Sequence, residues 1–93
     1  MLSLTAEAVE AIRAMTEDGD VGPNGGLRIS ALDAEGGEVE LEFDLAPEPS
    51  VGDEIVREGG ATVFLDLTAA DVLAEKTLGV HAHGDHVHFT LDD

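Results

Sequence analysis

A chain of 93 residues with 21 acidic side chains, four lysines and arginines and no cysteine carries a net charge of −17 and is long enough for one modest hydrophobic core. That charge repels phosphate backbones and anionic lipid surfaces, so we expect neither a nucleic acid nor a membrane as partner. The lack of cysteine excludes disulfides, thiolate metal ligands and a catalytic cysteine. Without an apolar run of membrane-spanning length or a secretory pattern, we expect one domain over residues 1–93, in the cytoplasm.

The first third of the chain predicts a helix followed by a strand. Apolar residues recur at helical spacing over residues 5–17, and Thr5 is the expected N-cap. Glycine, proline and Asn-Gly then mark a loop over 18–26. The segment "GLRISAL" over 26–32 predicts a strand, and "DAEGG" over 33–37 predicts a turn.

The segment "EVELEFDL" over residues 38–45 alternates between acidic and apolar side chains. One face would carry the apolar residues Val39, Leu41, Phe43 and Leu45. The other would carry the acidic residues Glu38, Glu40, Glu42 and Asp44. Because successive side chains of a strand point to opposite faces, this pattern predicts a half-buried strand with an acidic outer face.

After a connector over 46–54, the second half of the chain predicts a short strand at 55–56 and an apolar strand at 61–67. Thr68 is expected to cap a short helix, with Asp71 three residues later in a capping-box arrangement. A hairpin around "HGDH" completes the chain. Crossovers long enough for repeated βαβ units are missing, so we expect an α+β domain with a small mixed or antiparallel sheet system.

Almost the whole chain resembles the HesB/IscA-like family of A-type iron–sulfur carriers. The matching segments, in the family's order and nearly its spacing, are "LTAEAVEAIRAM", "GLRIS", "LEF", "GDEIV", "GATVFLD", "VLAEKTLGV" and "HVHFT". The resemblance implies a β-sandwich fold and a role around iron–sulfur assembly. It also implies a cysteine shortly before "LEF", near Ala34 in this chain, and two more in a tail, yet the chain has no cysteine. A cysteine-free relative that binds a protein partner fits this pattern, with no conventional cluster expected and self-association left open.

Enzymatic motifs are missing from the sequence. There is no phosphate-binding loop of the GxxxxGK[ST] type, no nucleophile elbow and no acid–base pair that stands out among the many carboxylates. Only three residues are aromatic, which disfavours a deep apolar ligand pocket. We therefore expect a binding protein and not an enzyme.

The segment "VHAHGDHVHF" over residues 80–89 holds every histidine of the chain. If Gly84 and Asp85 form a two-residue turn, His83 faces His86 and His81 faces His88, so that all four imidazoles share one face. The opposite, core-facing row would be Val80, Ala82, Val87, Phe89 and Leu91. Three or four imidazoles suit a zinc, nickel, copper or iron ion, and Asp85, Asp92 and Asp93 could add an oxygen ligand.

Three interpretations of this histidine hairpin remain open. It is an ordered metal site, a weak adventitious one, or the ordinary polar face of a hairpin. Its contrast with the all-acidic face of 38–45 favours a role for the imidazoles. The sequence therefore yields three hypotheses of function: a partner-binding protein of iron–sulfur assembly, a divalent-metal binder or sensor, and an interaction module without a metal role that differs from the first only in its partner. Salt adaptation is an open explanation of the acidic surface.

Overall fold

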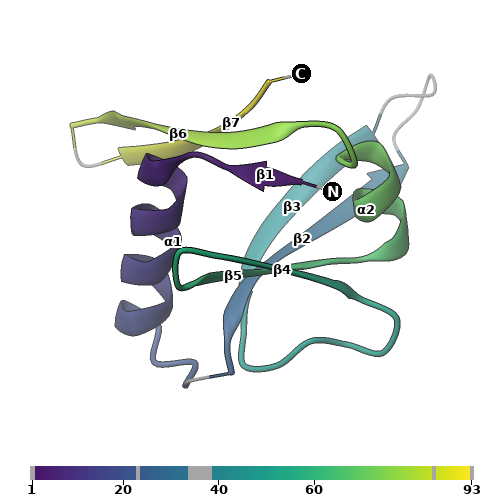
Figure 1. The fold of residues 1–93 in the computed structure, drawn as a ribbon, viewed down its shortest axis with the longest axis horizontal. Coiled ribbons are helices and arrows are strands. Elements are labelled where there is room, and N and C mark those ends of the chain that lie inside the picture. The colour runs from purple at the N-terminus through teal and green to yellow at the C-terminus, as the bar shows by residue number, and fades with distance from the viewer. Residues whose placement is uncertain (1, 23, 34–38, 85, 93) are drawn as a thin grey trace.

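A computed structural model describes residues 2–22, 24–33, 39–84 and 86–92. Within these ranges it does not describe the side chains of Asp33, Val39, Ala82, His83, His86 and Val87. The elements in chain order are β1 (Ser3–Leu4), α1 (Ala6–Asp18), β2 (Gly26–Asp33), β3 (Val39–Ala46), β4 (Glu54–Glu58), β5 (Ala61–Leu65), α2 (Leu67–Val72), β6 (Thr77–His83) and β7 (His86–Asp92) (Figure 1). The predicted α+β class is confirmed.

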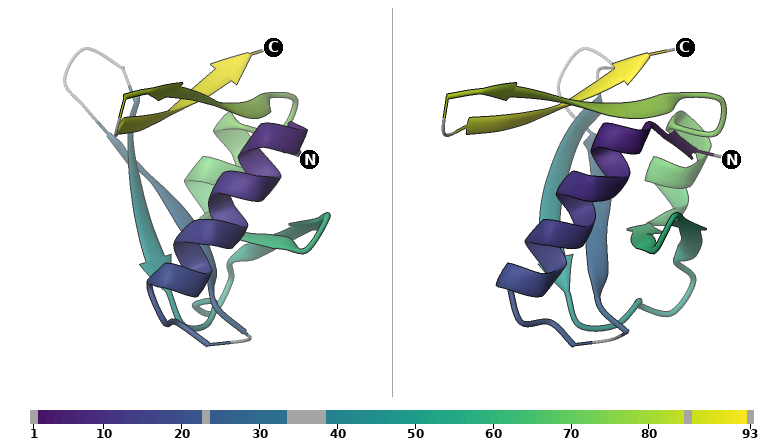
Figure 2. Two further views of the ribbon diagram at one scale, coloured as in Figure 1. Left: turned by 90° about the vertical axis from the view of Figure 1, so that its left-hand side faces the viewer. Right: turned by 60° about the vertical axis from the view of Figure 1, so that its left-hand side comes forward.

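The strands form two sheets. The four-stranded sheet has the order β3-β2-β5-β4 and the three-stranded sheet the order β1-β6-β7. β2 pairs with β5, and β1 with β6, in parallel, while the remaining pairs are antiparallel, so both sheets are mixed. The β6–β7 hairpin lies across one end of α1, and the four-stranded sheet runs along the helix (Figures 1 and 2).

The N-terminal helix begins as the sequence predicts. The hydroxyl of Thr5 accepts a hydrogen bond from the backbone N–H of Ala8 at 3.1 Å, which satisfies one of the donors that a helix leaves free in its first turn. Ala8 and Ile12, one turn apart, are fully buried. Among the described residues, no helix has the length and apolar character that crossing a membrane requires.

The hydrophobic core lies between α1, α2 and the two sheets. Its buried members are Leu2, Leu4, Ala8, Ile12, Leu27, Ile29, Val56, Ala61, Val63, Leu65, Ala69, Leu73 and Leu78. Phe64 is also fully buried but stands between Val63 and Leu65 in β5, so its side chain points to the other face of the sheet. There it pairs with Arg28 on one side and Ile55 on the other.

Three expectations for the elements need correction. Thr68 is not the cap of α2: Asp66 occupies that position, and its carboxylate accepts a hydrogen bond from the N–H of Ala69 at 2.7 Å. The strand expected at 61–67 therefore ends at Leu65, because the chain must leave the sheet to cap the helix. The short strand expected at 55–56 is the five-residue β4, and the two-residue β1 was not predicted.

Candidate functional site

The backbone of the histidine hairpin has the predicted register. β6 and β7 pair in antiparallel fashion, with His81 opposite His88 and His83 opposite His86. Two residues therefore connect the strands, and the first of them, Gly84, has a φ of 63°. Glycine adopts that conformation without the steric penalty of a Cβ atom, which suits a tight hairpin turn.

The described side chains of this hairpin divide between its two faces. His81 and His88 are exposed, whereas Val80, Phe89 and Leu91 are half-buried on the other face. Among the described side chains, no group of three or more histidines and acids is arranged to hold a metal ion. The side chains of His83 and His86 lie outside that set, as do Asp85 and Asp93, so the four-histidine site stays a prediction.

The acidic row on β3 lies where the alternation of the sequence predicts. Glu40, Glu42 and Asp44 are exposed, and the intervening Leu41, Phe43 and Leu45 are half-buried and pack against the core. The ring of Phe43 stacks on that of Phe89 in β7, with the centroids 5.1 Å apart and the planes 6° from parallel. β3 and β7 therefore contact each other through the side chains on their core-facing sides. Ala34, the expected position of the first family cysteine, lies outside the described residues.

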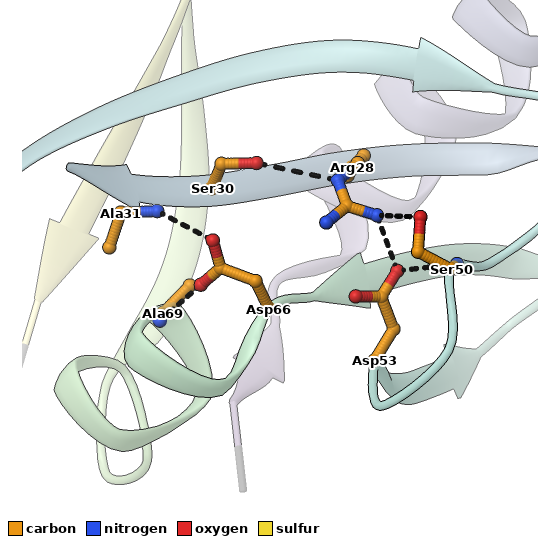
Figure 3. Close-up of polar contacts among 7 residues, drawn as sticks. All are labelled: Arg28, Ser30, Ala31, Ser50, Asp53, Asp66 and Ala69. Carbon is orange, nitrogen blue, oxygen red and sulfur yellow. Dashed lines mark hydrogen bonds and ion pairs between the residues drawn. The ribbon is translucent and has the colours of Figure 1, made fainter.

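Polar contacts around Arg28 hold the connector between β3 and β4 against the sheet (Figure 3). The sequence did not predict these contacts. Nη1 of Arg28 donates to Oδ2 of Asp53 at 2.6 Å and to the hydroxyl of Ser50 at 2.7 Å. The same carboxylate oxygen accepts from the N–H of Ser50 at 2.8 Å. The Asp53 side chain is only 3% exposed, so Arg28 is the cation that compensates a carboxylate largely removed from water. The one sequence feature that could have indicated this ion pair is that Arg28 is the only charged residue in the segment 26–32.

Asp66 joins α2 to the middle of the four-stranded sheet. One carboxylate oxygen caps the helix at Ala69, and the other accepts from the N–H of Ala31 in β2 at 3.3 Å (Figure 3). The backbone N–H of Asp66 donates in turn to the carbonyl oxygen of Ile29 at 3.4 Å. These bonds show that Ile29 and Ala31 direct their backbone groups away from β3 and toward β5 and α2.

A hollow of about 410 Å³ lies beside the C-terminal half of α1. Its lining includes Arg13, Thr16 and Glu17 of that helix and Gly60 and Thr62 beyond β4. The hydroxyl of Thr16 already donates to backbone oxygens of its own helix, at 2.9 and 3.0 Å. The hollow has no arrangement of groups that defines a chemistry.

The comparisons with known proteins agree on the fold. No family model and no curated protein sequence matches the chain. A crystal structure of SufA from Escherichia coli, involved in the biosynthesis of iron–sulfur clusters, superposes over 98% of this chain and 78% of its own, with a TM-score of 0.83 and 21% identity. IscA with a [2Fe–2S] cluster superposes over 100% of this chain and 85% of its own, with a TM-score of 0.80 and 21% identity.

A solution structure of a protein from Aquifex aeolicus is also similar, with a TM-score of 0.72 and 21% identity over 99% of this chain and 90% of its own. At this identity the likeness shows the fold. The chain therefore has the HesB/IscA-like fold, as the sequence resemblance predicts, and carries it without a cysteine.

Proposed function

We propose that this protein works in iron–sulfur cluster assembly by binding a protein partner, and not as a conventional cluster carrier. The observation that carries the proposal is the match of SufA and IscA to 98% and 100% of the chain, together with the absence of cysteine from its sequence. Clusters are held by thiolates, and carboxylates are poor substitutes for them. A cysteine-free chain with this fold lacks the thiolate ligands, and its surface remains available for recognition of a protein.

The proposed activity is binding, in the cytoplasm, and not catalysis. Its support is the acidic surface, which disfavours nucleic acid and anionic membrane and favours a basic protein surface. Complementary charge raises the rate of encounter with such a partner and penalises acidic competitors.

Anaerobic reconstitution with iron and sulfide tests the first half of the proposal. We expect no stoichiometric cluster on this chain under conditions in which IscA, whose structure contains a [2Fe–2S] cluster, acquires one as the positive control. A visible charge-transfer spectrum with stoichiometric iron and sulfide would show a carrier with unusual ligands and would overturn the proposal.

Cross-linking tests the second half. The untagged chain would be cross-linked in an extract of its source cells, and the joined peptides would be identified by mass spectrometry. We expect the proteins cross-linked to this chain to include one that assembles, carries or accepts iron–sulfur clusters. A heat-unfolded sample of the same chain is the control, because specific recognition requires the fold. If no such protein is joined to the folded chain, the assembly role is wrong.

The second candidate function is binding of a divalent ion at the histidine hairpin. It is supported by the register of β6 and β7, which sets His81 opposite His88 and His83 opposite His86 along the backbone. Directly opposed Cβ atoms of a hairpin lie about 4.5–5.5 Å apart, within reach of one shared ion. Zinc and nickel accept imidazole ligands, as do copper and iron.

Calorimetric titration of the untagged protein with Zn²⁺ and with Ni²⁺ tests this second function. We expect His83→Ala combined with His86→Ala to weaken binding at least tenfold, and binding to weaken as the pH falls because protons compete for the imidazole nitrogens. Glu40→Ala with Glu42→Ala is the matched control, since it removes two outward polar side chains from the other hairpin. Equal affinity in the wild type and the histidine variant would show that the histidines are only an outer polar face.

A further inference from the structure

The outer edge of β3 has no pairing strand in the part of the chain that the structure describes. β3 is an eight-residue strand that ends the four-stranded sheet, with β2 as its neighbour on the other side. Among the described residues, no further strand pairs with it and no backbone group from a loop bonds to it. An edge of this kind is a template on which another extended chain can pair.

The direction of the backbone groups in β3 follows from its neighbour. The carbonyl of Ile29 and the N–H of Ala31 bond to Asp66, on the side of β2 that faces away from β3. Since successive residues of a strand direct their backbone groups to alternate sides, Arg28, Ser30 and Leu32 bond toward β3. Their partners in the register are Asp44, Glu42 and Glu40.

The complementary residues of β3 therefore face the open edge. Because the backbone groups of the three acidic residues bond to β2, the N–H and carbonyl groups of Leu41, Phe43 and Leu45 point away from β2, toward the open edge. These three residues supply three donors and three acceptors at alternate positions. That is the set of bonds an added strand would use.

The side chains of β3 define what such a strand must carry. On the outer face, an added strand would lie beside Glu40, Glu42 and Asp44, all exposed. On the inner face, it would lie beside the half-buried Leu41 and Phe43. Opposite charges across a strand pair are stabilising, and apolar neighbours extend a buried row. Basic and apolar residues must therefore alternate in the added strand.

A second copy of this chain does not meet that requirement. Pairing β3 with β3 would bring one row of three acids beside another on the same face of the joined sheet. Like charges opposite one another in a strand pair are destabilising, and charged edge strands are a common defence against self-pairing. The acidic row thus rejects the identical edge and accepts a basic one.

We propose that the open edge of β3 binds an extended segment of a protein partner in which basic residues alternate with apolar residues, adding a strand to the four-stranded sheet. The edge groups of Leu41, Phe43 and Leu45 hold the segment, and Glu40, Glu42 and Asp44 select its charge. The inference rests on the proposed function only in taking protein binding as the activity of this chain.

The test uses the full chain, labelled with ¹⁵N, and a synthetic peptide as long as the eight-residue β3 in which lysine and valine alternate. Free protein should exchange the amide hydrogens of Leu41, Phe43 and Leu45 faster than those of Glu40, Glu42 and Asp44. Saturating peptide should slow exchange at the first three residues. Protection confined to another part of the chain, or none, would overturn the proposal.

Matched variants separate the acidic row from general charge. Neutralising the row with Glu40→Gln, Glu42→Gln and Asp44→Asn should weaken peptide binding about tenfold. The control, Glu10→Gln, Glu58→Gln and Asp71→Asn, removes the same number of exposed acids from other elements and should change the affinity by less than about threefold. Equal losses in the two variants would show that the attraction is not located at β3.

Modified peptides separate strand pairing from electrostatic attachment. N-methylation of alternate residues removes the donors on one edge of the peptide, and methylation of the other set removes those on the opposite edge. One set should abolish binding and the other should leave it nearly unchanged, because an added strand bonds through a single edge. Equal binding of both, or of a peptide with its lysines in one block, would overturn the proposal. These experiments use synthetic peptides and no protein of iron–sulfur assembly. Their outcome therefore tests strand addition at β3 separately from the proposed role in assembly.

Discussion

The antiparallel pairs β2–β3 and β6–β7 share an alternating arrangement of side chains and differ in the chemistry of their outer faces. Each places apolar residues inward, and the two inner rows meet where Phe43 stacks on Phe89. Outward, β3 carries the exposed acids Glu40, Glu42 and Asp44, whereas the β6–β7 hairpin carries the exposed His81 and His88. Carboxylates repel one another and attract basic groups, whereas imidazoles are common metal ligands. The period of two determines which residues face solvent, and the residue types there determine whether a face repels a copy of itself or offers ligands to a metal ion.

The largest expected effect lies at the ion pair that fastens the connector of the acidic hairpin. Arg28→Ala leaves the Asp53 carboxylate, 3% exposed, without its cation, and should lower the free energy of unfolding by about 3 kcal/mol. Arg57→Ala, which removes an exposed base from β4, should stay within about 0.5 kcal/mol of the wild type. Urea unfolding measures both.

A double variant makes the same test sharper. Arg28→Met with Asp53→Asn removes both charges, so no buried carboxylate is left alone, and it should be more stable than Arg28→Ala. If the double variant were the less stable of the two, the cost would come from lost packing and not from the stranded charge.

The next effect concerns Asp66, which anchors β2 from the side opposite β3. Asp66→Ala removes the cap of α2 and the bond to the N–H of Ala31, and should cost about 1–2 kcal/mol. Thr68→Ala, at the position that the capping-box pattern indicated, should cost less than about 0.5 kcal/mol, since Thr68 is exposed and is not the cap. Comparable losses in thermal unfolding would contradict this assignment.

The sequence predicted correctly those features that depend on residues close together in the chain. The strict alternation of residues 38–45 gave the faces of β3, and the glycine between two histidine-bearing segments gave the register of β6 and β7. Thr5 was identifiable as a cap because a periodic apolar run follows it. Thr68 failed because Asp66, two residues earlier, is at least as good a cap.

Contacts between distant segments had no local signal. Arg28 and Asp53 are 25 positions apart, and nothing in either segment specifies the other. The pairing of Ser3 with Thr77 in β1 and β6 rests on two residues, too short a stretch for a period to be visible. The open edge of β3 likewise depends on β2 taking β5 as its second neighbour, which is a property of the whole topology.

The contact between the two hairpins can be measured directly. In a double-mutant cycle of Phe43→Leu and Phe89→Leu, the stacked rings should show a coupling energy of about 1 kcal/mol beyond the sum of the single losses. Leucine keeps an apolar side chain at each site and removes the ring interaction. A cycle of Phe43→Leu with Leu91→Ala is the control and should couple more weakly. Strict additivity in the ring pair would mean that the hairpins fold independently of this contact.

The smallest effect separates the acidic row from the overall charge of the chain. With a net charge of −17, the melting temperature should rise with salt, because ions screen repulsion over a Debye length of about 10 Å at 0.1 M. Alternate residues of a strand are about 7 Å apart, so the three acids of β3 repel one another within that length. Neutralising Glu40, Glu42 and Asp44 should therefore raise the melting temperature at low salt by about 2–4 °C and flatten the salt profile. Neutralising the scattered acids Glu10, Glu58 and Asp71 should do less of both. Calorimetry over a salt series compares the two variants, and identical profiles would mean that total charge alone, and not the row on β3, sets the repulsion.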